Sequence, residues 1–197
     1  MKTLILAAIR CSLMFTAVAA LSVARPAKAN LVTNGGFETG DLTDWTQSGD
    51  SSATGVIMTS INNIAPHSGN FQLALGNVNT GFLSQMLALA VGTTYTVDFW
   101  LANNVSGTNS FAASLGGFTG FSLTNAADSG YTEHTFNFTY TGGSTQVLFT
   151  STNVIGEWLL DDVSVNPVGA VPDGGSTVSL LGFALFGLAA LRRRLGC

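Results

Sequence analysis

The chain has 197 residues, 9% of them charged, and a formal net charge of −4 at pH 7. All seven Lys and Arg residues lie before residue 30 or after residue 191, so residues 30–170 carry ten acidic side chains and no basic one. This charge excludes nucleic acid and other polyanions as partners of the central segment, and the positions of Cys11 and Cys197 exclude disulfides and thiolate metal sites within it.

The first 29 residues have the organisation of a secretory signal peptide. Lys2 and Arg10 give a positively charged start, and residues 11–23 form an apolar run. Ala27-Lys28-Ala29 then offers small residues at the two positions that a signal peptidase requires. We therefore predict that residues 1–29 are removed by cleavage after Ala29.

Residues 30–168 are rich in Gly, Ser, Thr and Asn, which is typical of short strands and turns, and their number suits one domain. Within residues 94–102, Tyr95, Val97, Phe99 and Leu101 alternate with other residues and should share one face of a strand. Related patterns predict further strands at 54–59, 71–76, 82–90, 111–115, 118–123, 134–140, 144–151 and 157–165.

Two glycine pairs predict tight turns between neighbouring strands. Gly116-Gly117 separates the strands at 111–115 and 118–123, and Gly142-Gly143 separates those at 134–140 and 144–151. Each pair of strands is expected to form a hairpin. With no helix predicted in this part of the chain, we expect an all-β fold, an antiparallel β-sandwich over residues 30–168.

Four segments of the body together resemble a known group of folds. They are "NLVTNGGFETGDLTDW" at its start, "HSGNFQLALG" and "GFLSQMLALAVGTTYTVDFWLA" in its middle, and "EWLLDDVSV" at its end. These segments are similar to the galactose-binding-like jelly rolls, which include the carbohydrate-binding modules of the 4/9/22 type and the DUF642 proteins. The resemblance implies a jelly roll in which the first and last strands are neighbours.

This resemblance also implies a structural Ca²⁺ held by Glu38 and Asp161. Backbone carbonyls would complete the site, because hard cations need several oxygen ligands at once. The strand pattern places Asp161 on one face with Leu159, Val163 and Val165, pointing inward, and Asp162 on the other face. A buried carboxylate needs a partner, and no Lys or Arg is present. That partner must be either a metal ion or a ring of N–H donors. The alternative to the calcium site is therefore an Asp161 that is hydrogen-bonded and a Glu38 that faces the solvent.

The three tryptophans of the body are candidates for stacking against a sugar ring. Trp45 and Trp158 are expected in the core of a jelly roll. Trp100 lies on the face opposite Tyr95 and Phe99, so we predict it as the sugar-binding platform, with Asn103 as a hydrogen-bonding neighbour.

A catalytic site is not expected. Glu133 and His134 are adjacent, so on a strand their side chains point to opposite faces and cannot act as a pair. The remaining carboxylates fall in no recognisable catalytic setting. We predict that the protein is not an enzyme.

The C-terminal end predicts a membrane anchor. Residues 174–191 carry no charge, and a helix of that length would extend about 27 Å, close to the thickness of the hydrocarbon core of a bilayer. We predict a transmembrane helix at 176–191, and the basic tail at 192–197 contains Arg192, Arg193 and Arg194. Basic residues prefer the cytoplasmic side, so the body is expected outside.

Immediately before this helix, the linker 169–175 contains the sequence Val171-Pro172-Asp173-Gly174-Gly175. A short motif of this kind, an apolar helix and a terminal arginine cluster, in that order, strongly resemble the PEP-CTERM sorting signals, in the variant that begins Val-Pro-Asp. The usual form of the variant is Val-Pro-Asp-Ser-Gly, whereas this chain has two glycines after Asp173. The resemblance implies processing by an exosortase, a membrane transpeptidase.

Together these features predict an exported protein that is held in the inner membrane and then passed to the cell surface or the extracellular matrix. We expect the β-sandwich to be structural or adhesive, with a polysaccharide as a candidate partner. A dedicated carbohydrate-binding, lectin-like module is the alternative hypothesis, and a glycoside-active enzyme is the third.

Overall fold

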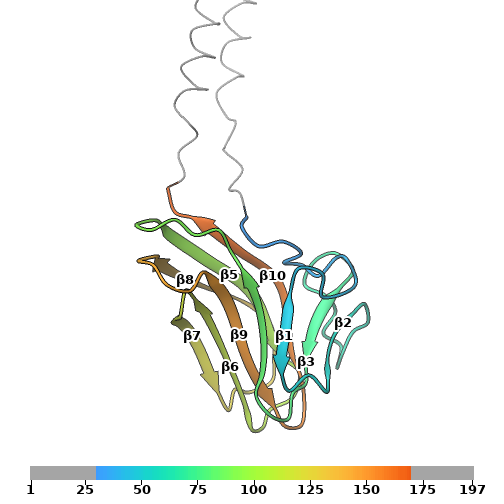
Figure 1. The fold of residues 1–197 in the computed structure, drawn as a ribbon. Helices are drawn as coiled ribbons and strands as arrows, with labels where there is room; N and C mark the ends of the chain where they lie inside the picture. The colour runs from blue at the N-terminus through green and yellow to red at the C-terminus, as the bar shows by residue number, and fades with distance from the viewer. Residues whose placement is uncertain (1–29, 170–197) are drawn as a thin grey trace, which may run out of the picture. The chain divides into compact units, whose positions relative to one another are not determined.

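The computed structural model describes residues 30–169, which form ten strands in two five-stranded antiparallel sheets that face each other (Figure 1). Sheet 1 has the order β1 (Thr46–Gly49), β4 (Gly81–Met86), β9 (Gln146–Asn153), β6 (Asn109–Leu115) and β7 (Phe118–Thr124). Sheet 2 has the order β2 (Thr54–Ile57), β3 (Gln72–Leu75), β10 (Trp158–Pro167), β5 (Thr94–Asn103) and β8 (Ser129–Thr139).

This architecture confirms the prediction of an all-β, antiparallel jelly-roll sandwich. Within residues 30–169 no helix is long and apolar enough to cross a membrane. The predicted signal peptide, sorting motif, transmembrane helix and basic tail lie outside the described residues.

Alternating apolar residues of both sheets build the core. On β5, Tyr95, Val97, Phe99 and Leu101 are all buried, as their alternation predicts. Phe99 packs against residues of the opposite sheet, with its ring centroid 5.9 Å from that of Phe111 and 5.5 Å from that of Phe149. Contacts of this kind hold the two sheets together.

The hairpin between β6 and β7 is confirmed. Leu115 pairs with Phe118, and the two turn residues Gly116 and Gly117 have φ values of 62° and 85°. Side chains with a Cβ atom adopt this left-handed region at a cost, so glycine suits the turn.

The predicted hairpin between the strands at 134–140 and 144–151 is wrong. Strand β8 pairs with β5 in sheet 2, whereas β9 pairs with β4 and β6 in sheet 1. Both strands direct apolar side chains into the same core from opposite sides, Phe136 from β8 and Val147 from β9. The glycine turn therefore carries the chain from one sheet to the other.

The first residues of the domain, which form no strand, lie along its last strand, β10. The first strand, β1, pairs with β4 in the other sheet, so the expectation that the first and last strands are neighbours is wrong. The N–H of Leu31 donates to the carbonyl of Val165 at 2.9 Å, and the N–H of Val163 donates to the carbonyl of Gly35 at 2.9 Å. A Cβ atom at Gly35 would overlap the carbonyl oxygen of Val163, so only glycine permits this approach.

Strand β1 was not predicted. It is four residues long and mostly exposed, so it has no apolar alternation, and it forms by pairing with β4. Strand β4 ends at Met86, four residues before the predicted end at Ala90.

Candidate functional site

A β-bulge in β10 determines where its two aspartates point. Asp161 pairs with Trp100 and Ser164 pairs with Asp98, so Asp162 and Val163 together lie opposite a single residue of β5. Asp162 has a φ of 48°, in the left-handed region. An extra residue reverses the alternation of the side chains beyond it.

The bulge corrects the predicted orientation of Asp161. Val163 and Val165 belong to the main core between the sheets. Leu159, two residues before Asp161, belongs to a separate apolar cluster, with Ala74 and Ala102. Asp161 is therefore buried on the outer side of sheet 2, and it does not share a face with Val163 and Val165.

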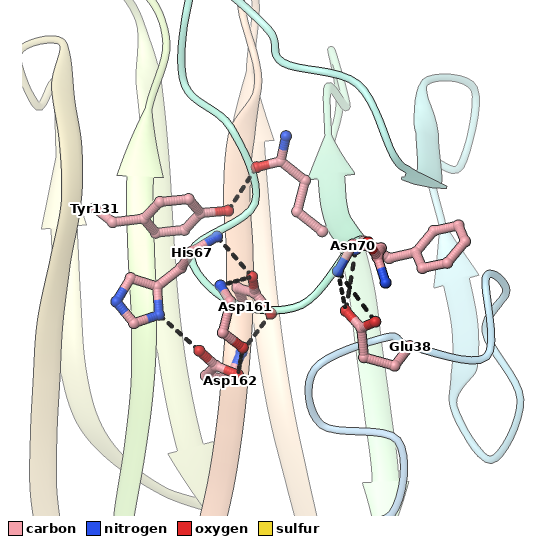
Figure 2. Close-up of polar contacts among 9 residues, drawn as sticks. Glu38, His67, Asn70, Tyr131, Asp161 and Asp162 are labelled. Atoms are coloured by element: carbon pink, nitrogen blue, oxygen red, sulfur yellow. Dashed lines mark hydrogen bonds and ion pairs between the residues drawn. The ribbon is translucent and has the colours of Figure 1, made fainter.

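A ring of N–H donors surrounds the buried carboxylate of Asp161 (Figure 2). Its Oδ2 accepts hydrogen bonds from the backbone N–H of His67 at 2.9 Å and of Ser68 at 3.3 Å, and its Oδ1 accepts the N–H of Asp162 at 2.8 Å. Burial raises the pKa of Asp161 to about 6, the charge of Asp162 adds to the rise, and the three hydrogen bonds oppose it.

Asp162 faces the same loop, because the bulge turns it back towards residues 67 and 68. Its Oδ2 lies 2.6 Å from Nδ1 of His67, and its Oδ1 accepts a hydrogen bond from Ser68 Oγ at 2.7 Å. The predicted placement of Asp161 and Asp162 on opposite sides of the strand is thus wrong. Figure 2 shows the loop lying across β10 with both carboxylates directed to it.

His67 covers one face of the predicted sugar platform. Its ring stacks on Trp100, with the two centroids 3.7 Å apart and the ring planes at 15° to each other. Trp100 is half-buried. Sugar stacking on Trp100 stays a prediction, and it would have to use the ring area that His67 leaves open.

Glu38 binds the end of the same loop. Both of its carboxylate oxygens accept the N–H of Asn70, at 3.0 and 3.1 Å, and its Oε1 also accepts the N–H of Phe71 at 3.0 Å (Figure 2). A Cβ atom at Gly36 would lie 3.8 Å both from Asp161 Oδ1 and from Glu38 Cγ. The structure therefore brings the two predicted metal ligands to one place, with residues 67–71 bound to both.

The hydrogen bonds of Glu38 and Asp161 do not fit a calcium shell. Calcium takes six to eight oxygen ligands, and here the two carboxylates are directed at backbone N–H groups, which cannot bind a cation. Among residues 30–169 no group of three or more His, Cys, Asp and Glu side chains is arranged to hold a metal. Calcium binding stays a prediction that this donor set does not favour.

The effect of calcium on the stability of the protein can be measured directly. We expect the melting temperature of the protein to change by less than about 1 °C between excess Ca²⁺ and a chelator, because the N–H donors already satisfy both carboxylates. Differential scanning fluorimetry measures this, with Mg²⁺ as the control cation. A rise specific to Ca²⁺ would show that residues 67–71 release Glu38 and Asp161 to a metal.

Asn103 is corrected from a ligand-binding residue to a structural one. Its side chain is completely buried. The side-chain amide donates to the carbonyls of Ala126 and Ala127 at 3.1 and 3.0 Å, and its oxygen accepts a hydrogen bond from Asn153. A ligand outside the domain cannot reach it.

The other two tryptophans lie in the core, as predicted. Trp45 is 7% exposed and donates its indole N–H to the carbonyl of Asn34 at 3.0 Å. Trp158 is 1% exposed and donates to the carbonyl of Thr152 at 3.1 Å.

Sheet 1 presents an outer face that the sequence analysis did not identify. Its inward positions, such as Leu83, Phe111 and Phe149, lie in the core, so the alternate positions point away from it. Strand pairing aligns these outward residues in two rows that cross all five strands. One row is Ser48, Phe82, Thr150, Ala112 and Ser122, and the other is Thr46, Ser84, Leu148, Ser114 and Thr119.

We call these two rows the serine–threonine face. None of the ten acidic residues of the body belongs to it, and most of its members carry a hydroxyl group, which can both donate and accept a hydrogen bond. The alternate positions of 110–114 and of 148–152 carry mostly small hydroxyl residues, with Ala112 and Leu148 as exceptions, and this pattern was visible in the sequence. The order of the strands, which joins these residues into one face, could not be seen in the sequence.

Comparison with known proteins gives two family matches. A family model described as "Carbohydrate binding domain" matches residues 29–152, and a model described as "VPDSG-CTERM motif" matches residues 170–195. The second match confirms the resemblance of the C-terminal end to a sorting signal. No curated protein matches the chain.

Several solved structures share the fold. TmCBM61 in complex with β-1,4-galactotriose is 24% identical, with a TM-score of 0.53 over 70% of this chain and 98% of that one. The CBM22-1 xylan-binding domain of Paenibacillus barcinonensis Xyn10C is 20% identical, with a TM-score of 0.53 over 75% and 100%. The K3 cleaved adhesin domain of Lys-gingipain from Porphyromonas gingivalis is 15% identical, with a TM-score of 0.50 over 68% and 98%.

Proposed function

Because the chain belongs to the carbohydrate binding domain family, we propose that it is an exported surface or matrix protein whose β-sandwich binds a neutral polysaccharide without cleaving it. The bound glycan would make the domain adhesive, which joins the two functions expected from the sequence. The serine–threonine face is the proposed binding surface.

The distribution of charge supports this choice of surface. Residues 30–169 carry ten carboxylates and no Lys or Arg, yet the serine–threonine face contains none of these carboxylates. A neutral glycan that lies on this face would not require the removal of water from a charged group, which is costly. An acidic glycan would meet an anionic domain without a cation to pair with it.

The dimensions and chemistry of the face also suit a glycan chain. Neighbouring strands are about 4.8 Å apart, so a row across five strands extends about 19 Å, enough for several sugar units. The serine and threonine hydroxyls of this face, except that of the buried Ser84, can exchange hydrogen bonds with sugar hydroxyls. Phe82, which is 36% exposed, and Leu148 offer apolar contact for the C–H groups of the rings.

A catalytic function is not proposed. Glu133 lies opposite Trp100 on the outer side of sheet 2 and is exposed. His134 lies opposite Phe99, its ring centroid is 4.2 Å from that of Phe121, and burial lowers its pKa. The two residues point to different sides of the sheet, and the matching family is named for binding.

The C-terminal motif supports the proposed location. A VPDSG-CTERM motif is typical of an exported, surface-directed protein. We propose that an exosortase recognises Val171 to Gly175 and that Arg192, Arg193 and Arg194 keep the tail on the cytoplasmic side of the inner membrane until processing. The sandwich would then reach the matrix polysaccharide that it binds.

A central substitution on the face tests the binding site. Thr150→Arg places a long side chain in the middle of one row, and we expect it to weaken polysaccharide binding about tenfold, or by about 1.4 kcal/mol. Affinity electrophoresis in gels that contain galactan, xylan or a soluble β-glucan measures the change.

Thr135→Arg is the matched control. Thr135 is an exposed strand residue on the outer side of sheet 2, opposite Asp98. The control should bind as the wild type does. Absence of binding to every neutral polysaccharide, or equal binding by both variants, would contradict the proposed surface.

A further inference from the structure

We propose that a pocket at the loop end of the sandwich, separate from the serine–threonine face, binds a single neutral sugar unit such as the end of a glycan chain. The proposal rests on the carbohydrate-binding function proposed above, but on different residues. The pocket has a volume of about 370 Å³ and lies among the loops that follow β5 and β9, the loop that follows β2, and the end of β3.

Glu157 and Asn104 form the polar wall of the pocket and hold each other in place. Asn104 Nδ2 donates to Glu157 Oε2 at 2.7 Å, and the backbone N–H of Glu157 donates to Asn104 Oδ1 at 2.7 Å. The N–H of Asn104 also donates to the carbonyl of Glu157 at 3.1 Å. These three bonds orient the carboxylate before a ligand arrives, which reduces the entropy lost on binding.

Polar groups remain for a ligand. Among the described residues, the hydrogen bonds of the Glu157 carboxylate all go to Oε2, so Oε1 is left as an acceptor. Asn62 uses its Nδ2 to donate to the carbonyl of Asn104 at 3.1 Å, and its side-chain oxygen has no donor within residues 30–169. A carboxylate oxygen and an amide oxygen on one wall can accept hydrogen bonds from neighbouring sugar hydroxyls.

Two glycines allow the walls of the pocket to pack closely. Gly76 and Gly156 both line it, and a Cβ atom at Gly76 would lie 2.9 Å from Glu157 Cγ. A Cβ atom at Gly156 would lie 2.8 Å from the Cβ of Val105. A side chain at either position would push against these neighbours and disturb the walls of the pocket.

An apolar edge completes the pocket. Val154 is 44% exposed and Ile155 is 64% exposed, and both line the pocket. Ligand sites combine apolar contact with a few placed polar groups, and this pocket is at the small end of their usual size range. A sugar ring presents both an apolar C–H side and a rim of hydroxyls, so it matches both walls.

The charge of the pocket defines the class of sugar. Glu157 is its one charged residue, and the whole described domain has no Lys or Arg. A uronic acid or a phosphorylated sugar would bring its charge next to this carboxylate, which is unfavourable. The pocket is therefore suited to neutral sugars.

Ligand-observed NMR tests the proposal with the full chain in a detergent that has no sugar headgroup. Galactose, glucose, xylose and mannose are the probes, with glucuronate as the charged counterpart. We expect saturation-transfer signals from at least one neutral sugar with a dissociation constant in the millimolar range, and none from glucuronate.

Two variants locate the binding. Glu157→Gln keeps the shape of the side chain but removes its charge, and Ile155→Ser removes an exposed apolar side chain that the core does not need. Each should weaken monosaccharide binding about fivefold or more, because a charged acceptor or an apolar contact is lost. Thr135→Arg, which lies outside both the pocket and the serine–threonine face, is the control, and it should leave monosaccharide binding unchanged.

The outcomes separate this inference from the proposed function. No signal from any neutral monosaccharide, or binding that neither pocket variant weakens, overturns the pocket, while polysaccharide binding that is sensitive to Thr150→Arg would still stand. If Thr150→Arg abolishes monosaccharide binding and the pocket variants do not, the sugar unit binds on the face and the pocket is rejected.

Discussion

Gly35→Ala is expected to lower the melting temperature of the domain by about 10 °C, the largest effect of any substitution proposed for this protein. The added Cβ atom would overlap the carbonyl oxygen of Val163, so the N-terminal segment must move away from β10. That movement breaks the hydrogen bond from Val163 N to Gly35 O and disturbs the fully buried Phe37. We expect a cost of about 3 kcal/mol or more, from strain and lost packing.

Gly55→Ala is the control for this prediction. Gly55 is a strand residue with no atom within 4 Å of an added Cβ, and its φ is not positive. Its replacement should change the melting temperature by less than about 2 °C. Thermal unfolding followed by circular dichroism measures both variants, and a similar effect at the two positions would refute the role assigned to Gly35.

The stability of the domain should also depend on the protonation of Asp161. Burial raises the pKa of this carboxyl from its ordinary 3.8 to about 6 in the folded domain. A raised pKa contributes stability that is fully present below the unfolded value and is lost as the pH rises through the folded value. Between pH 4.5 and pH 7.5 this group should therefore decrease the free energy of unfolding by about 2 kcal/mol.

His134 also contributes to the pH dependence of stability, so the test is a difference between variants. His67, Asp162 and Tyr131 surround Asp161, and burial lowers the pKa of His134, which opposes the effect of Asp161 because its contribution is lost as the pH falls. Subtracting the pH profile of Asp161→Asn from that of the wild type leaves the contribution of Asp161. Urea unfolding at a series of pH values supplies both profiles.

Asp98→Asn is the control for the pH experiment. Asp98 is a half-buried residue on the same side of sheet 2, where its carboxylate accepts a hydrogen bond from Ser164 Oγ at 3.4 Å. Asp161→Asn should reduce the pH dependence of stability more than this variant does. If Asp161→Asn keeps the wild-type pH profile, Asp161 does not titrate in this range and its burial is not the cause of a raised pKa.

Local patterns predicted much of the fold because they depend on neighbouring residues alone. The alternation in 94–102 identified the inward side of β5, and Gly116-Gly117 identified a turn. The same alternation, extended by two residues from Leu101, would also have placed Asn103 in the interior of the sandwich. The prediction of Asn103 as a ligand contact was therefore avoidable.

Other features could not be read from local pattern. The strands on either side of Gly142-Gly143 have the same alternation whether they pair with each other or lie in different sheets. The bulge at Asp162 could not be predicted from the local sequence either. It depends on how β10 pairs with β5, since the register of the pairing shifts between Asp161 and Ser164. Because the bulge adds one residue to β10, the alternation counted from Val163 and Val165 predicted the wrong face of the sheet for Asp161.

The sequence by itself determined the class of the fold, the absence of basic residues from the body and the sorting motif at the C-terminal end, since each is a property of composition or of a short run of residues. The tertiary structure alone decided that residues 67 and 68 supply the donors around Asp161, that five strands join their hydroxyl residues into one face, and that loops far apart in the chain enclose a pocket. The physical reason is that these features depend on which distant segments pair, and pairing is decided by the packing of the whole core.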